Sequence, residues 1–201
     1  MDIYKVFLLV LAFALNMTKI YSQQSMDQYK VIFTNPPQHV PTSKTPDAPI
    51  AGNGDIGVTM GGGPDSLRFY IGKNDFWRAY PVYPGGIALP GGLDILFKEL
   101  KDASYYAEQL PGSAEIKATF STKACQVHLS AWVAATANKI IIELRSDKKQ
   151  IAHVCLWTVE GNGAITAHGN SPVTWVSRSF QTTKLLSWPT HIALAMNTEK
   201  D

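Results

Sequence analysis

Residues 52–57 read GNGDIG and satisfy the G-x-G-x-x-G pattern of dinucleotide-binding loops. Such a loop binds a pyrophosphate because its glycines let the backbone approach the phosphates, and because a helix follows whose first N–H groups point at them. The chemistry therefore needs a strand before the glycines and a helix after them. The sequence predicts neither, since the prolines of PTSKTPDAPIA disfavour a central strand and the glycines and proline of VTMGGGP disfavour a helix.

Turn chemistry explains the same residues better. Glycine and asparagine tolerate positive φ, so Asn53, Gly54 and Asp55 favour a tight turn. IGVTM is then predicted as a strand, GGGPD as a second turn and LRFYIG as the returning strand. This part of the chain therefore predicts a glycine-rich hairpin, and no cofactor is expected.

Carboxylates that could act as a general acid and base occur in turn-like contexts, where aspartates hydrogen-bond their own backbone. The aspartates concerned are Asp47, Asp55, Asp65, Asp75 and Asp94. Asp55 and Asp75 stand at the two ends of the hairpin region and are the pair to test first. The five histidines are scattered and no G-x-S-x-G motif accompanies them, so no catalytic residue is assigned.

The two cysteines, Cys125 and Cys155, stand in neither a CxxC motif nor a Cys/His cluster. A structural zinc site is therefore not expected. In an exported protein the two thiols either form a disulfide or remain free inside strands. The aspartate-rich turns lack the spacing of a calcium loop, so no metal ligand is assigned.

Alternating apolar and polar residues define the elements that must position these groups. The alternation occurs in YKVIFT, LRFYIG, AEIKATF, CQVHLSAWV, KIIIELR, IAHVCLWTV and HIALAM. A period of two predicts half-buried antiparallel strands, because successive side chains point to opposite faces. The stretch from Leu96 to Leu110 is predicted either as a short helix or as two strands joined at Lys101-Asp102. The expected fold is all-β, an antiparallel β-sandwich (super-sandwich) that is incomplete at the C-terminus.

The N-terminus predicts export. Eighteen Lys and Arg against sixteen Asp and Glu give a net charge of +2, which does not indicate a nucleic-acid partner. Residues 6–15 read VFLLVLAFAL, a run much shorter than the roughly 20 residues of a membrane span. Residues 1–22 are therefore predicted to be a cleaved signal peptide, with no membrane span afterwards. The expected location is the medium, the periplasm or the cell surface.

The hairpin region also resembles a known family. PIAGNGDIGVTMGGGPDSLRFYIGKNDFWR is similar to the opening of the N-terminal β-sandwich domain of glycoside hydrolase family 95. The matching positions are Pro49, Gly52, Asn53, Gly54, Ile56 and Gly57 in the turn, Asn74, Asp75, Phe76 and Trp77 in the closing motif, and Tyr106, Leu110 and Ala114 downstream. Gln109-Leu110-Pro111 departs from the usual Leu-Asp-Leu, and Asn74-Asp75 lacks the usual acidic residue between them. These departures leave a neighbouring branch of the family and the related disaccharide phosphorylases as alternatives.

The resemblance implies a fold, a substrate class and a partner. Enzymes of this family couple the sandwich to an (α/α)6 barrel, whose carboxyl groups hydrolyse α-L-fucosides or α-L-galactosides with inversion. Residues 23–201 would then be the N-terminal sandwich of a secreted glycoside hydrolase, truncated before its catalytic barrel. Asn53 and Asp55 would hydrogen-bond either a sugar hydroxyl or a loop of the barrel. Trp77 would either offer a flat apolar face to the sugar or fill the core.

Two other classes of function remain open at this point. Aromatic-rich sandwiches also serve as stand-alone secreted carbohydrate-binding or adhesive modules. The third hypothesis is a purely structural domain that docks on a barrel. A large exposed apolar patch would support this hypothesis.

Overall fold

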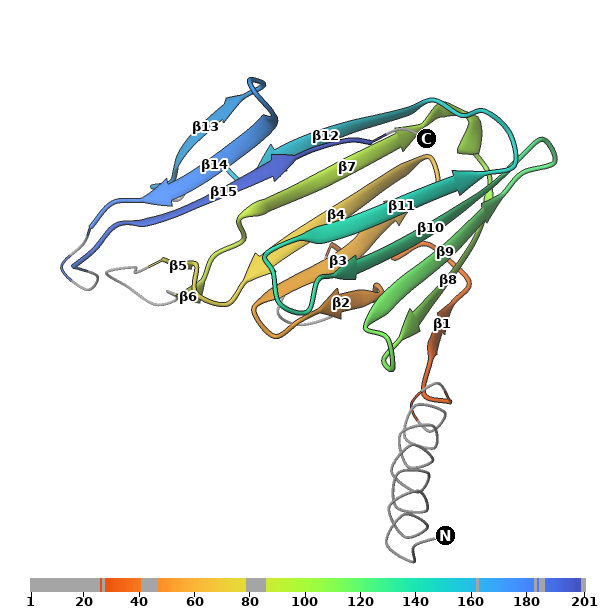
Figure 1. The fold of residues 1–201 in the computed structure, drawn as a ribbon, viewed down its shortest axis with the longest axis horizontal. Coiled ribbons are helices and arrows are strands. Elements are labelled where there is room, and N and C mark those ends of the chain that lie inside the picture. The colour runs from red at the N-terminus through yellow and green to blue at the C-terminus, as the bar shows by residue number, and fades with distance from the viewer. Residues whose placement is uncertain are drawn as a thin grey trace, which may run out of the picture.

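The chain is all-β, and its two main sheets pack as an antiparallel β-sandwich in the computed structural model (Figure 1). The structure describes residues 26, 28–40, 47–78, 86–161, 163–182, 184 and 187–199. Sheet I contains, in spatial order, β1 (Val31–Phe33), β8 (Ser104–Leu110), β9 (Glu115–Ser121), β10 (Gln126–Val133) and β11 (Ile140–Ser146). Sheet II contains β12 (Ala152–Thr158), β7 (Gly91–Phe97), β4 (Ser66–Lys73), β3 (Ile56–Gly63) and β2 (Ile50–Gly52).

The core lies between these two sheets and follows the predicted alternation. On β4, Leu67, Phe69 and Ile71 are buried, while on β9 the buried residues are Ile116, Ala118 and Phe120. These apolar side chains form one cluster with those of β3, β7, β8 and β10. Burial of one face per strand is what drives the two sheets together, because apolar area removed from water contributes about 25 cal/mol per Å².

The interpretation of GNGDIG as a turn is confirmed. β2 and β3 pair antiparallel with Gly52 opposite Gly57, and β3 pairs with β4 with Gly63 opposite Ser66. The chain therefore reverses at the quoted residues and again at Pro64-Asp65, and strands stand where a nucleotide-binding loop would need a helix.

The region from Leu96 to Leu110 forms two strands joined by a short connection. β7 ends at Phe97, a 3₁₀ turn covers Lys98–Leu100, and β8 starts at Ser104. Asp102 adopts a φ of 63° in the reversal, and Leu100 is fully buried. The second of the two predicted alternatives is therefore correct. The apolar residues have helical spacing here because Leu100, a core residue, lies on the turn that connects the two strands.

A third sheet lies beside the sandwich and was not predicted in full. It contains β13 (Ile165–Gly169), β14 (Thr174–Phe180) and β15 (Thr190–Met196), of which only β15 showed clear alternation. Phe180 on β14 packs against Phe76, with ring centroids 5.7 Å apart, in a second small core. This core places the ribbon of β5 (Trp77–Arg78) and β6 (Gly86–Ile87) next to the third sheet.

The remaining expectations concern the N-terminus and the two cysteines. The predicted signal peptide, residues 1–22, lies outside the described residues. Within the part of the chain that the structure describes, no helix is long and apolar enough to cross a bilayer. Both cysteines carry free thiols, with Cys125 buried and Cys155 exposed, so the disulfide alternative is not realised.

Candidate functional site

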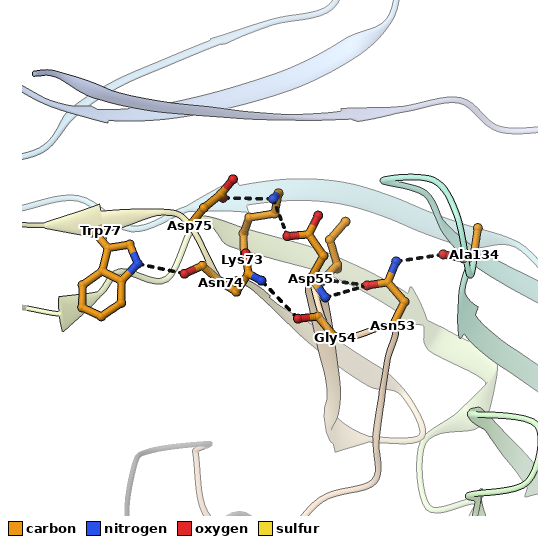
Figure 2. Close-up of polar contacts among 9 residues, drawn as sticks. Asn53, Gly54, Asp55, Lys73, Asn74, Asp75, Trp77 and Ala134 are labelled. Carbon is orange, nitrogen blue, oxygen red and sulfur yellow. Dashed lines mark hydrogen bonds and ion pairs between the residues drawn. The ribbon is translucent and has the colours of Figure 1, made fainter.

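The β2–β3 turn is built around the side chain of Asn53 (Figure 2). Its Oδ1 accepts hydrogen bonds from the backbone N–H groups of Asp55 at 3.0 Å and Ile56 at 2.8 Å. Its Nδ2 donates to the carbonyl oxygen of Ala134, just beyond the end of β10, at 2.9 Å. One side chain thus closes the turn in sheet II and fastens it to sheet I.

Two glycines of the motif are required by this turn. Gly54 has a φ of 89°, a left-handed conformation that residues with a Cβ rarely adopt. A Cβ at Gly52 would lie 2.7 Å from the carbonyl oxygen of Ile56, which accepts the hydrogen bond from the Asn53 N–H. The glycines serve the backbone path of a hairpin, which explains a phosphate-loop pattern without phosphate chemistry.

The two aspartates singled out from the sequence meet on one lysine. Lys73, at the end of β4, places its Nζ 2.6 Å from Asp55 Oδ1 and 2.9 Å from Asp75 Oδ1 (Figure 2). The hydrogen bonds to Asp55 and then to Asp75 raise the pKa of Lys73 above its usual value. The side chain of Lys73 is 14% exposed, so the ammonium is held between the two carboxylates.

This arrangement does not suit an inverting glycosidase. The sum of the two Lys73 distances falls below the roughly 6.5–9.5 Å that separates the two carboxyl groups of such enzymes. Asp55 and Asp75 therefore form an ion triad with Lys73.

Asn74 and Trp77 continue the same network. Asn74 Nδ2 donates to the carbonyl oxygen of Gly54 at 3.2 Å, and Trp77 Nε1 donates to the carbonyl oxygen of Asn74 at 2.8 Å (Figure 2). Trp77 is 49% exposed, so it does not fill the core. Its neighbour Phe76 is 3% exposed and takes the core position instead.

An open hollow of about 480 Å³ lies beside the turn. Its walls come from β2, the β2–β3 turn, the end of β4, Ile87 and the β8–β9 turn. Asp55 and Lys73 lie at this hollow, whereas Asn53 and Trp77 are not among its lining residues. The structure thus joins all three predicted residues through one network but places only Asp55 at the hollow.

Sequence reasoning missed Lys73 and the Ala134 carbonyl. Lys73 had a usable signal, because it directly precedes Asn74-Asp75 at the predicted end of a strand. Ala134 contributes only its backbone, and no side-chain pattern reports such a contact across the sandwich.

Two other kinds of site, a metal centre and a histidine site, find little support among the described residues. They contain no group of three or more His, Cys, Asp or Glu side chains arranged to hold a metal ion. His128 bonds to Thr119 across neighbouring strands at 3.1 Å, an ordinary surface contact of sheet I.

The comparisons with known proteins add no relative. The chain matches no model of a known protein family, and a search of the curated proteins finds no match.

Proposed function

We propose that this chain is the N-terminal, non-catalytic β-sandwich domain of a secreted glycoside hydrolase. The whole enzyme would cleave α-L-fucosides or similar glycans by inverting hydrolysis, with an (α/α)6 catalytic barrel outside this chain. One observation carries the proposal: residues that bear the family resemblance, Gly52 to Asp55 and Asn74 to Trp77, form one connected network within an antiparallel sandwich. The β3–β4 hairpin brings the two segments together by placing Ile56 opposite Lys73.

The carboxylates of Asp55 and Asp75 at the candidate site are engaged in ion pairs. The one close pair of carboxylates at the candidate site is bridged by Lys73. Asp94 lies on β7, not in a turn, and accepts two hydrogen bonds from Arg68 at 2.7 and 2.6 Å, while Asp47 accepts the backbone N–H of Gln38 at 2.9 Å. The hydrolytic chemistry is therefore assigned to the barrel.

The coding sequence that follows codon 201 tests the proposal. We expect a continuing frame of helical hairpins whose joined product hydrolyses 4-nitrophenyl α-L-fucoside or α-L-galactoside, with the inverted anomer appearing first by NMR. The 201-residue chain alone should hydrolyse neither substrate. Hydrolysis by the chain alone, or a joined product inactive on both substrates, would refute the proposal.

A second candidate function is a stand-alone secreted carbohydrate-binding or adhesive module. A separate cleft of about 660 Å³ between β12, β13 and β14 favours it, because Trp157, Trp175, His168 and Glu160 all line this cleft. Indole rings beside hydrogen-bonding side chains are a common way to bind sugars. Glycan binding by the chain alone, lost in Trp175→Ala and without any hydrolysis, would favour this candidate over the first.

A further inference from the structure

We propose that the hollow beside the β2–β3 turn is a docking site for an apolar protein segment that carries a lysine or arginine, and that it is not a sugar site. The inference goes beyond the proposed function, because it holds whether or not the docked segment belongs to a hydrolase. It rests on three features of the hollow: its polar groups, its exposed apolar side chains and its charge.

The polar side chains around the hollow are already engaged within the protein. Lys73 donates to Asp55, and Asn74 Nδ2 donates to the carbonyl oxygen of Gly54. Gln109 Oε1 accepts the backbone N–H of Ile50 at 3.0 Å. Sugar sites depend on a few convergent polar groups that remain available to the ligand, because each hydroxyl must regain the hydrogen bonds it loses to water. This hollow offers few such groups, which argues against a sugar.

Large apolar side chains, by contrast, are left exposed. Ile50 and Ile87 line the hollow and are 48% and 57% exposed. Trp77 pairs directly with Ile87 across the β5–β6 ribbon and is 49% exposed, so it extends the apolar surface. Directly opposed residues of an antiparallel pair lie on the same face. An apolar surface next to a hollow is what a partner's apolar side chains bury.

The ion triad beside this surface carries a net negative charge. Lys73 carries one positive charge against the two negative charges of Asp55 and Asp75. The cation is also the least accessible of the three, since its side chain is 14% exposed against 39% for Asp55 and 72% for Asp75. A partner segment is therefore complementary when it combines apolar side chains with a cation placed near Asp75.

Two further glycines keep the hollow open. Gly57 and Gly72 are paired across β3 and β4 and both line the hollow. A Cβ at Gly57 would meet nothing within 4 Å, and one at Gly72 would make only an ordinary contact at 3.9 Å. Unlike Gly52 and Gly54, these two are not required by the backbone. A side chain there would occupy space that the docked segment needs.

A titration of the ¹⁵N-labelled chain with small probes tests the proposal by NMR. The probes are acetyl-Leu-Leu-Arg-amide, the matched acetyl-Leu-Leu-Glu-amide and L-fucose, and the amide signals of Gly54, Gly57 and Gly72 report on the hollow. We expect saturable shifts with the arginine peptide, binding weaker by roughly two- to fivefold with the glutamate peptide, and none with L-fucose.

Gly57→Val should abolish the shifts that the peptide causes at Gly54 and Gly72, while the melting temperature stays at or above that of the parent chain. Gly72→Leu repeats the test from the opposite strand. Gly63→Val is the matched control, because Gly63 lies on β3 outside the hollow and its Cβ would make only an ordinary 3.4 Å contact with Asp65. This control should bind the peptide like the parent chain.

Each other outcome overturns the proposal. Shifts at these glycines with L-fucose would make the hollow a sugar site and would leave the glycosidase assignment intact. No shifts with either peptide, equal binding of the two peptides, or full binding by a folded Gly57→Val chain would show that the hollow docks no such segment. None of these results depends on hydrolase activity, so failure here is distinct from failure of the proposed function.

Discussion

Replacing Asn53 by alanine should destabilise the sandwich, because this one side chain makes three hydrogen bonds in two sheets. The substitution removes the acceptor for two backbone N–H groups of the turn and the donor to the Ala134 carbonyl. A hydrogen bond contributes a net of about 0.5–1.5 kcal/mol, and water can reach part of this half-buried turn, so we expect a loss of roughly 2–3 kcal/mol.

Asn53→Asp separates the two parts of this effect. Aspartate keeps an acceptor for the turn, but it lacks the N–H that reaches Ala134 and places a negative charge near that carbonyl oxygen. The expected loss is about 1–2 kcal/mol, between those of the parent and the alanine variant. If Asn53→Asp loses nearly as much free energy of unfolding as Asn53→Ala, most of the loss comes from the bond to Ala134 between the sheets.

Urea unfolding followed by tryptophan fluorescence gives both free energies of unfolding by linear extrapolation. For a loss of 2–3 kcal/mol the midpoint should fall by roughly 1–2 M urea. Asn35→Ala is the control, since Asn35 makes one exposed side-chain bond, to Thr34 at 3.3 Å. A loss below about 0.5 kcal/mol for Asn53→Ala, no larger than that of the control, would refute the assigned role.

Three further outcomes are expected. Lys73→Met should destabilise the chain near neutral pH. Because folding raises the pKa of Lys73, its contribution to the free energy of unfolding is present below the unfolded pKa of about 10.4 and is lost as pH rises through the folded pKa. Melting temperatures of the parent and the variant measured across this pH range would show the loss. Gly52→Ala should lower the free energy of unfolding by about 1–3 kcal/mol, because its Cβ would lie 2.7 Å from a backbone carbonyl oxygen. Gly57→Ala should raise it by up to about 1 kcal/mol, because its Cβ meets no atom within 4 Å. Thermal unfolding that shifts in the same direction for both variants would contradict this prediction. A thiol reagent should label the exposed Cys155 in the native state and Cys125 only after unfolding, and labelling of both thiols at equal rates would contradict the assigned burial.

Most of the sandwich could be predicted because burial of one sheet face leaves a direct trace in the sequence. Leu67, Phe69 and Ile71 alternate with more exposed residues, and their burial follows that alternation. The third sheet was harder, because β14 buries Arg178 at 3% exposure between Val176 and Phe180. A buried arginine breaks the apolar pattern on which strand prediction depends.

The candidate site was predicted in its residues but not in their roles. Asn53, Asp55 and Trp77 do belong to one network, yet Asn53 turns inward to close a turn and Trp77 lies exposed. The contact of Lys73 with Asp55 follows from the β3–β4 hairpin, which places Ile56 opposite Lys73. No sequence pattern reports the bond from Asn53 to the Ala134 carbonyl oxygen.

The sequence by itself determined that the chain reverses at residues 52–57 and that its strands bury one face each. Both follow from local chemistry: the φ angles open to glycine and asparagine, and the opposite orientation of successive side chains in a strand. Tertiary structure alone decided that Asn53 of one sheet meets a carbonyl oxygen beside the other sheet. Such contacts depend on how the sheets stack and in which register, and residues 81 positions apart in the chain carry no local sign of meeting.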